Sequence, residues 1–358
     1  MLSIRAFTRK IRTLIAPFIL SVKDTYRTGY RPYKQSLPFR RFLYFHVMNA
    51  SPSSWHLEVA RIDGALPLLS RTEATLLARS SLRRLWTHHV SAYPFENLGP
   101  DHDPGLDAAE LVRSYHVAER DAFLSWIARR AAPPLAHAAA TVLAAKGAPE
   151  VFARGYAIAD SAVERLDALL PTEDPLAALV DLVGQLSEAE TSFLEGGSET
   201  YLAAGRAFSR PPTRGGAWAA SLAVAMRPQL FALGAAPLAL AGLLPREAFQ
   251  LMRERSVPAI LTGALLSAAT AVRTDIIGAR AAIDLAKARL AKIKRSSRAH
   301  DAWLLLAGVG PLTRAEIARA LDVTKRTASQ AAAILDEAGM IAPTGRYEGL
   351  RIVAAHES

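Results

Sequence analysis

The histidines are the residues whose type could support metal or acid–base chemistry, and four of the nine lie between positions 88 and 119. These four are His88, His89, His102 and His116. A zinc site of the His-Glu-x-x-His type needs two histidines four residues apart on one helix face. No pair in the sequence combines that spacing with the required glutamate. We therefore expect no metal site, and Asp101-His-Asp103 before Pro104 favours a turn followed by a helix cap.

Other catalytic signatures are also missing from the sequence. The chain contains no cysteine, which excludes a thiol nucleophile, a thiolate metal site, an iron–sulfur cluster and a disulfide framework. It has no P-loop, no G-x-G-x-x-G motif and no G-x-S-x-G motif. We predict no catalytic residue and no cofactor, and we expect a protein that is not an enzyme.

Two short helices joined by a tight turn are predicted near the C-terminus. The first covers residues 312–321, where Thr313 and Glu316 have the spacing of a capping box, in which each side chain satisfies a free backbone amide. Asp322-Val323 forms the turn, and Ala318 is small where the helices must cross closely. This arrangement indicates a helix-turn-helix.

The second helix of the pair is predicted over residues 325–338. Thr324 is placed to cap its start, and Gly339 is suited to the left-handed conformation that often ends a helix. Two short strands, at 340–342 and 350–353, follow around a turn that contains proline and glycine. We predict that this hairpin forms a wing beside the two helices.

This segment resembles the winged helix-turn-helix domain of MarR-like bacterial regulators, over about residues 300–354. The family pattern is met at Leu312, Thr313, Glu316, Ile317, Ala318, Leu321, Val323, Thr324, Thr327, Ser329, Leu335, Gly339 and Ile341. Two features depart from it. Ala328 and Ala332 replace larger apolar residues, and Asp322 stands where glycine is common, at a steric cost if the turn requires a left-handed backbone.

The resemblance implies that the second helix lies in the major groove of double-stranded DNA with its first residues at the base edges. Lys325 and Arg326 would contact guanine or phosphate, Gln330 would pair with adenine, and hydroxyl groups would contact either. The implied DNA-binding residues are Thr324, Lys325, Arg326, Thr327, Ser329 and Gln330, together with Arg346 in the wing turn. The function so implied is sequence-specific DNA binding, most plausibly transcriptional regulation in a bacterial cytoplasm.

An alternative reading of the same segment keeps the fold and changes the partner. Residues 292–358 carry ten basic and seven acidic residues, which is only a small positive excess for a DNA-binding surface. Winged helices also dock other proteins. The alternative is therefore a non-enzymatic protein-interaction protein, or a plasmid replication or partition accessory protein.

The formal charge of +10 is concentrated at the N-terminus. Residues 1–45 hold ten basic groups and one acid, so the rest of the chain is nearly neutral. We treat 1–47 as a basic, aromatic-rich arm. It could attract a phosphate backbone or an anionic membrane surface, act as a targeting segment, or be an over-long start with Met48 as the initiator.

Residues 48–272 are predicted to form an all-helical body. With 51% hydrophobic and 21% charged residues, the chain is typical of a globular protein. Amphipathic patterns interrupted by prolines predict helices at 71–86, 107–130, 135–147, 150–170 and 175–195. A Gly- and Pro-rich segment at 196–216, around a short helix, is expected to be a linker or exposed loop.

Two nearly uncharged segments, 217–245 and 256–272, must be weighed as membrane spans. A span needs about 20 continuous apolar residues. Arg227-Pro228 interrupts the first segment, and the second is too short and contains Pro258. We predict buried core helices here, in a cytoplasmic protein, with a membrane-associated protein as a further alternative. The core could instead line a pocket for a small-molecule effector of unknown identity.

Residues 273–299 are predicted to form an amphipathic helix that connects the body to a domain at 300–358. Two sets of residues recur every seven positions: an apolar seam of Ile276, Ile283 and Leu290, and a basic row of Arg273, Arg280, Lys287 and Lys294. The seam fits an ordinary amphipathic helix, or packing against a partner helix. We therefore expect a homodimer formed through residues 273–298 or through the body.

Overall fold

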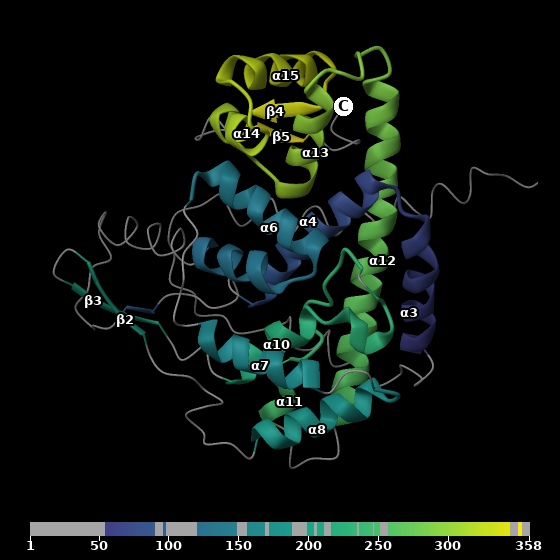
Figure 1. Ribbon diagram of the computed structural model, residues 1–358, viewed down its shortest axis with the longest axis vertical. Helices are drawn as coiled ribbons and strands as arrows, with labels where there is room; N and C mark the ends of the chain where they lie inside the picture. Colours follow the sequence, from purple (N-terminus) through teal and green to yellow (C-terminus); the bar gives the residue numbers. More distant parts are fainter. Residues whose placement is uncertain are drawn as a thin grey trace, which may run out of the picture. The chain divides into compact units, whose positions relative to one another are not determined.

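Helices make up most of the part of the chain that the computed structural model describes, which confirms the predicted mainly α class (Figure 1). The predicted arm at 1–47 and Arg346 lie outside this part. The described residues are 54–89, 96–97, 120–148, 156–168, 172–187, 199–203, 206–210, 216–234, 236–245, 247–250, 257–343 and 350–352.

The first described helices are α3 (Ser54–Ala65) and α4 (Arg71–His89), joined through the short 3-10 turn η2 (Leu66–Leu68). Glu73 closes the start of α4, because its carboxylate accepts a hydrogen bond from the backbone N–H of Ser70 at 2.7 Å. The helix predicted at 71–86 is confirmed and extends three residues further. Its apolar positions, among them Leu85, are buried as their spacing requires.

The middle of the body is also helical, in four segments. Residues 120–130 form a helix, followed by α6 (Pro133–Lys146), α7 (Ala157–Ala168) and α8 (Pro175–Ser187). Proline stands at the start of α6 and α8, where its missing N–H leaves no intrahelical bond unmade. Each segment overlaps a predicted helix, although residues 107–119 of the first prediction lie outside the described residues.

The prediction of an all-helical body is wrong at the segment 196–216, where a short helix was expected. Strands β2 (Glu199–Ala203) and β3 (Arg206–Arg210) pair antiparallel, and β1 (Glu96–Asn97) pairs with the other edge of β3. The two longer strands are five residues each and contain Thr, Tyr and Phe, types that favour strands. Two residues including a glycine separate them, which is a hairpin spacing.

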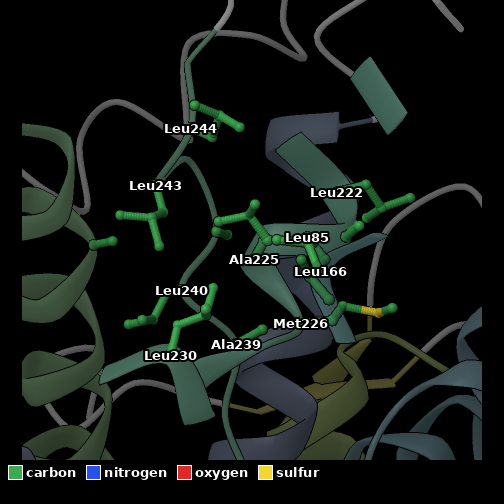
Figure 2. Close-up of a cluster of buried hydrophobic side chains, with 14 of the residues drawn as sticks. Leu85, Leu166, Leu222, Ala225, Met226, Leu230, Ala239, Leu240, Leu243 and Leu244 are labelled. Atoms are coloured by element: carbon green, nitrogen blue, oxygen red, sulfur yellow. The ribbon is translucent and has the colours of Figure 1, made fainter. Parts of the chain in front are cut away.

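Most of the nearly uncharged segment 217–245 is buried in the core of the body, but it forms an α-helix only at its start. Helix α10 (Gly216–Ala225) is followed by the 3-10 turn η4 (Pro228–Phe231) and by an irregular stretch before α11 (Glu247–Gln250). Figure 2 shows side chains of this segment clustered with those of α4 and α7. The members of the cluster are fully or nearly fully buried: Leu85, Leu166, Leu222, Ala225, Met226, Leu230, Ala239, Leu240, Leu243 and Leu244.

Helix α12 (Val257–Arg289) is the longest helix in the described chain and joins two segments that the sequence separated at residue 272. Among the described residues it is the one helix long and apolar enough to cross a membrane, with 33% of its most apolar window buried. This is weak evidence, because a core helix passes the same test. Ten α12 residues, including Leu265 and Val272, are buried in the protein.

Two hydrophobic cores share helices α4 and α12. On α12, buried residues up to Ile276 belong to the body core, whereas Ala279, Ile283 and Ala286 belong to a second core with the C-terminal helices. Likewise Leu76 of α4 packs in the second core, while most of α4 packs in the first. The body and the C-terminal segment therefore join through continuous helices.

Within the described residues, the C-terminal segment contains three helices and a pair of short strands. Helix α13 (Ala299–Val309) comes first, and α14 (Arg314–Ala320) and α15 (Lys325–Glu337) match the positions predicted for the two helices within a few residues. Strands β4 (Ile341–Pro343) and β5 (Leu350–Ile352) pair antiparallel, with Ile341 opposite Ile352.

Candidate nucleic-acid interface

The junction between α14 and α15 has the local geometry that the sequence predicts. Both hydrogen bonds of the capping box are present, with the Thr313 N–H donating to the Glu316 carboxylate at 2.7 Å and the Glu316 N–H donating to the Thr313 hydroxyl at 3.2 Å. Asp322 in the turn has φ 50°, the left-handed region, so the steric cost expected for a non-glycine residue applies here. Gly339 after α15 has φ 64°, as predicted.

The two helices pack through small residues. Ala328, Ala331, Ala332 and Leu335 form the buried face of α15, and Ile317 and Ala318 form that of α14. Ala328 is 0% exposed, although a larger apolar residue is usual at this position of the family pattern. Ala331 and Ala332 are likewise almost completely buried, with 2% and 1% exposed, so the small residues on this face of α15 lie in the second core.

The first turns of α15 present polar side chains outward. Lys325, Arg326, Ser329 and Gln330 are exposed, and their side chains make no hydrogen bond or ion pair with another described residue. Their polar groups are therefore accessible to solvent and are not engaged by the protein. A ligand with acceptor atoms could therefore be bound without breaking existing contacts.

The two threonines at the start of α15 serve the helix itself. The Thr324 hydroxyl accepts a hydrogen bond from the Thr327 N–H at 3.2 Å and lies 2.9 Å from the Thr327 hydroxyl. Thr324 is thus the N-cap, as predicted. Thr327 is half-buried, so its hydroxyl is less accessible than the side chains of its neighbours.

Helix α15 also carries a feature that the sequence reasoning missed. Asp336 and Glu337 are exposed at its C-terminal end, so the charge along the helix changes sign between Lys325–Arg326 and this end. Carboxylates at a helix C-terminus oppose the helix dipole and therefore do not stabilise α15. Helical periodicity could have placed both acids on the exposed face.

Ion pairs and hydrogen bonds tie α14 to α6 of the body. Lys146 lies 2.7 Å from the Glu316 carboxylate, and the Arg319 guanidinium donates to the Ala145 carbonyl at 2.9 Å. Burial raises the pKa of Glu316, but hydrogen bonds from Lys146 and Thr313 outweigh it, so the pKa is lowered overall. Glu316 therefore links the start of α14 to the body.

A second contact joins α13 to α4. The Arg79 guanidinium donates to the Leu304 carbonyl at 2.6 Å, and the Arg79 side chain lies against the backbone of Gly308. Arg79 is buried, and desolvation lowers its pKa to about 10. A glycine is needed at position 308 because a Cβ there would lie 2.9 Å from that of Arg79 and closer still to its Cδ.

Three of the four cations in the basic row predicted along residues 273–298 form ion pairs with acids of the same chain. Arg273 pairs with Glu58 of α3 at 2.7 Å, and Arg280 pairs with Glu73 of α4 at 2.9 Å. The apolar seam of Ile276, Ile283 and Leu290 is likewise buried against the chain's own helices. The partner of this seam is therefore the same chain. A homodimer through other faces of residues 273–298 or through the body remains a prediction.

The described histidines give no sign of metal chemistry. In the described ranges, no three His, Asp or Glu residues are grouped so that they could hold a metal ion. His89 is buried at the end of α4, and its backbone carbonyl accepts a hydrogen bond from the Trp218 indole at 2.7 Å. Desolvation, with a smaller contribution from His88, lowers the pKa of His89 to about 3, so the side chain is neutral. His102 and His116 lie outside the described residues.

Comparison with known proteins adds no family to this picture. No family model matches the sequence, and no curated protein is significantly similar to it.

Proposed function

We propose that the protein binds double-stranded DNA sequence-specifically through residues 300–358, acting as a winged helix-turn-helix, and that it serves as a bacterial transcriptional regulator in the cytoplasm. The observation that carries the proposal is the start of α15. There a capped helix presents Lys325, Arg326, Ser329 and Gln330 to solvent with no intramolecular partner among the described residues. Strands β4 and β5 would form the wing.

The chemistry of this surface fits a DNA groove. The free N–H groups at the start of α15 and the positive end of its dipole favour a phosphate. Lys325 and Arg326 can bind phosphates or the acceptor atoms of guanine, and Gln330 can form a bidentate pair with adenine. Thr324 fixes the start of the helix, and Ser329 can donate to or accept from a base edge. Arg346 would reach the adjacent minor groove from the wing.

The helical body would set the position of the DNA-binding segment. Lys146, Arg79 and Arg289 each contact the C-terminal segment, so movement of the body would be transmitted to α14 and α15. In this proposal the body also supplies a homodimer interface and the binding site of a small-molecule effector, and no enzymatic activity is involved.

Selection of bound sequences from a random duplex library, followed by a gel-shift titration, tests the proposal. The full chain should enrich a defined sequence motif. The double variant Lys325→Ala/Arg326→Ala should lose retention of the enriched duplex. The matched control Arg71→Ala/Arg165→Ala removes two exposed cations from the body and should bind normally. Unchanged binding by Lys325→Ala/Arg326→Ala would overturn the assignment of α15.

A second candidate function has one specific observation in its favour. The acidic end of α15, at Asp336 and Glu337, is unfavourable near phosphates and suits a basic protein surface. In that case the segment would dock a protein, as in a plasmid replication or partition accessory protein. The library selection separates the two, because a docking protein would enrich no sequence motif.

A further inference from the structure

The turn between α12 and α13 holds a concentration of positive charge. Six basic residues and no acid lie between positions 287 and 298: Lys287, Arg289, Lys292, Lys294, Arg295 and Arg298. We call residues 290–298 the basic loop. The basic loop lies within the helix predicted at 273–299, where only every seventh residue was considered as a basic row.

The basic loop has a fixed shape that turns its cations outward. Leu290 is buried and Ile293 packs against the second core, so the apolar residues anchor the loop. The Ile293 N–H donates to the Leu290 carbonyl at 2.9 Å, and the Ser297 N–H donates to the Lys294 carbonyl at 2.9 Å. An anchored loop loses little conformational entropy when a ligand binds.

Three of the loop cations are available to a ligand. Lys292, Lys294 and Arg295 are exposed, and none of them makes an ion pair or side-chain hydrogen bond with another described residue. Arg298 differs, since it pairs with Asp301 at 2.9 Å. The loop therefore presents three uncompensated positive charges within four residues.

The basic loop lies beside the C-terminal end of α15. The Arg289 guanidinium, immediately before the loop, donates to the carbonyl of Gly339, two residues after the end of α15, at 2.7 Å. Figure 1 shows the turn at the upper end of α12 close to this end of α15. Thirteen residues of helix span about 20 Å, so Lys325–Arg326 and the loop stand at opposite ends of α15.

We propose that the basic loop is a second DNA-contacting element, which binds backbone phosphates while the start of α15 reads bases. This inference rests on the proposed DNA-binding function. A helix about 20 Å long exceeds the major groove width of about 12 Å, so when its first turns enter the groove its far end reaches the level of the flanking backbone. There Asp336 and Glu337 alone would repel phosphates, and Lys292, Lys294 and Arg295 supply the opposing charge.

Salt dependence distinguishes a phosphate contact from a base contact. Each phosphate contact contributes about 0.9 to the slope of log K against log salt concentration. The variant Lys292→Ala/Lys294→Ala should therefore lower the magnitude of the slope by about 1.8 and weaken binding of both specific and random duplexes. The charge-conserving variant Lys292→Arg/Lys294→Arg should retain the slope of the wild type. Arg71→Ala/Arg165→Ala is the control for loss of two cations elsewhere.

The measurement is a fluorescence anisotropy titration of the full chain, from about 50 to 200 mM salt, with the enriched duplex and a scrambled duplex. We expect Lys292→Ala/Lys294→Ala to lose affinity for both duplexes by a similar factor, so that the preference for the enriched sequence is kept. An unchanged slope for Lys292→Ala/Lys294→Ala overturns the inference while leaving the proposed function intact. If the wild-type chain binds neither duplex, the proposed function itself fails. The inference is also overturned if the wild-type chain floats with anionic phosphatidylglycerol vesicles while Lys292→Ala/Lys294→Ala does not float and binds DNA normally. The loop would then be assigned to a membrane surface.

Discussion

The ammonium of Lys146 and the carboxylate of Glu316 lie 2.7 Å apart although 170 positions separate them in the sequence. Glu316 also closes the capping box of α14, so one carboxylate serves a local and a long-range contact at once. Both side chains are mostly buried, with 23% and 16% exposed. The pair therefore couples the end of α6 to the start of the proposed DNA-binding unit.

Substitutions at Glu316 should separate these two contacts. Glu316→Gln keeps the capping-box geometry and loses the charge pair, whereas Glu316→Ala loses both. We expect Glu316→Ala to reduce the free energy of unfolding by about 1–2 kcal/mol and Glu316→Gln to reduce it by less. Urea denaturation followed by circular dichroism measures both values. Lys146→Met should resemble Glu316→Gln, and equal effects of all three variants would contradict the dual role.

The buried His89 should make stability sensitive to pH well above the carboxylate range. Its pKa is lowered to about 3 in the folded protein, against about 6.5 in an unfolded chain. The unfolded state therefore binds an extra proton between these values, so this contribution is complete above pH 6.5 and is lost as the pH falls. The expected slope is about 1.4 kcal/mol per pH unit in this range.

Urea titrations at about pH 7.5, where this contribution is complete, and at several values from about pH 6 to pH 5, below the unfolded histidine pKa, measure that slope. His89→Phe and His89→Gln should each flatten it, whatever their effect on stability at neutral pH. The exposed His137 on α6 provides the control, since His137→Gln should keep the wild-type slope. Loss of stability from the lowered pKa values of Glu73 and Glu316 begins only as the pH falls below the unfolded glutamate value.

The contact between Arg79 and Gly308 predicts an exception to helix propensity. Alanine is normally favoured over glycine inside a helix by about 1 kcal/mol. In α13, however, a Cβ at position 308 would overlap the Arg79 side chain. We expect Gly308→Ala to destabilise the protein by about 1–3 kcal/mol through overpacking.

A double-mutant cycle measures this coupling. An Arg79→Gly background removes the Cβ, Cγ and Cδ atoms that a Cβ at position 308 would meet, so Gly308→Ala should become neutral or stabilising there. Gly278 of α12 is the matched control, because nothing lies within 4 Å of a Cβ placed on it. Additive effects of the two substitutions would show that Arg79 does not restrict position 308.

The features that the sequence predicts well, such as helix caps, depend on residues close together in the chain. The features that it misses depend on contacts between distant segments. The capping box at Thr313 and the cap at Gly339 involve residues a few positions apart, so type and spacing suffice. The pairing of Arg280 with Glu73 depends on how α12 packs against α4, and no period in the sequence encodes it. For this reason the seven-residue period identified the basic row but not the ion pairs that three of its four residues make within the chain.

The same distinction explains the errors in the element assignments. The hairpin of β2 and β3 is short, and its strands lack the long alternation that identifies a half-buried sheet. The predicted boundary between the body and the connecting helix was placed after residue 272, where the sequence changes from apolar to charged residues. Helix α12 continues through it because Val272 and Ile276 keep the helical spacing of the buried face. The exposed residues at the start of α15 were found because Thr324 fixes where the helix begins.

The acidic end of α15 provides the last prediction, and it distinguishes DNA from a basic protein as the partner. Asp336 and Glu337 lie on the exposed face near the helix C-terminus, where negative charge opposes the helix dipole. Asp336→Asn/Glu337→Gln should therefore raise the free energy of unfolding by about 0.3–1 kcal/mol per residue. It should also strengthen DNA binding at low salt, because repulsion between these carboxylates and phosphates is removed, and the gain should shrink as salt screens it. Anisotropy titrations at two salt concentrations measure the effect, with Asp301→Asn, which releases Arg298 without altering α15, as the comparison. Weaker binding of a protein ligand together with unchanged DNA affinity would instead identify this end of α15 as a protein-docking surface.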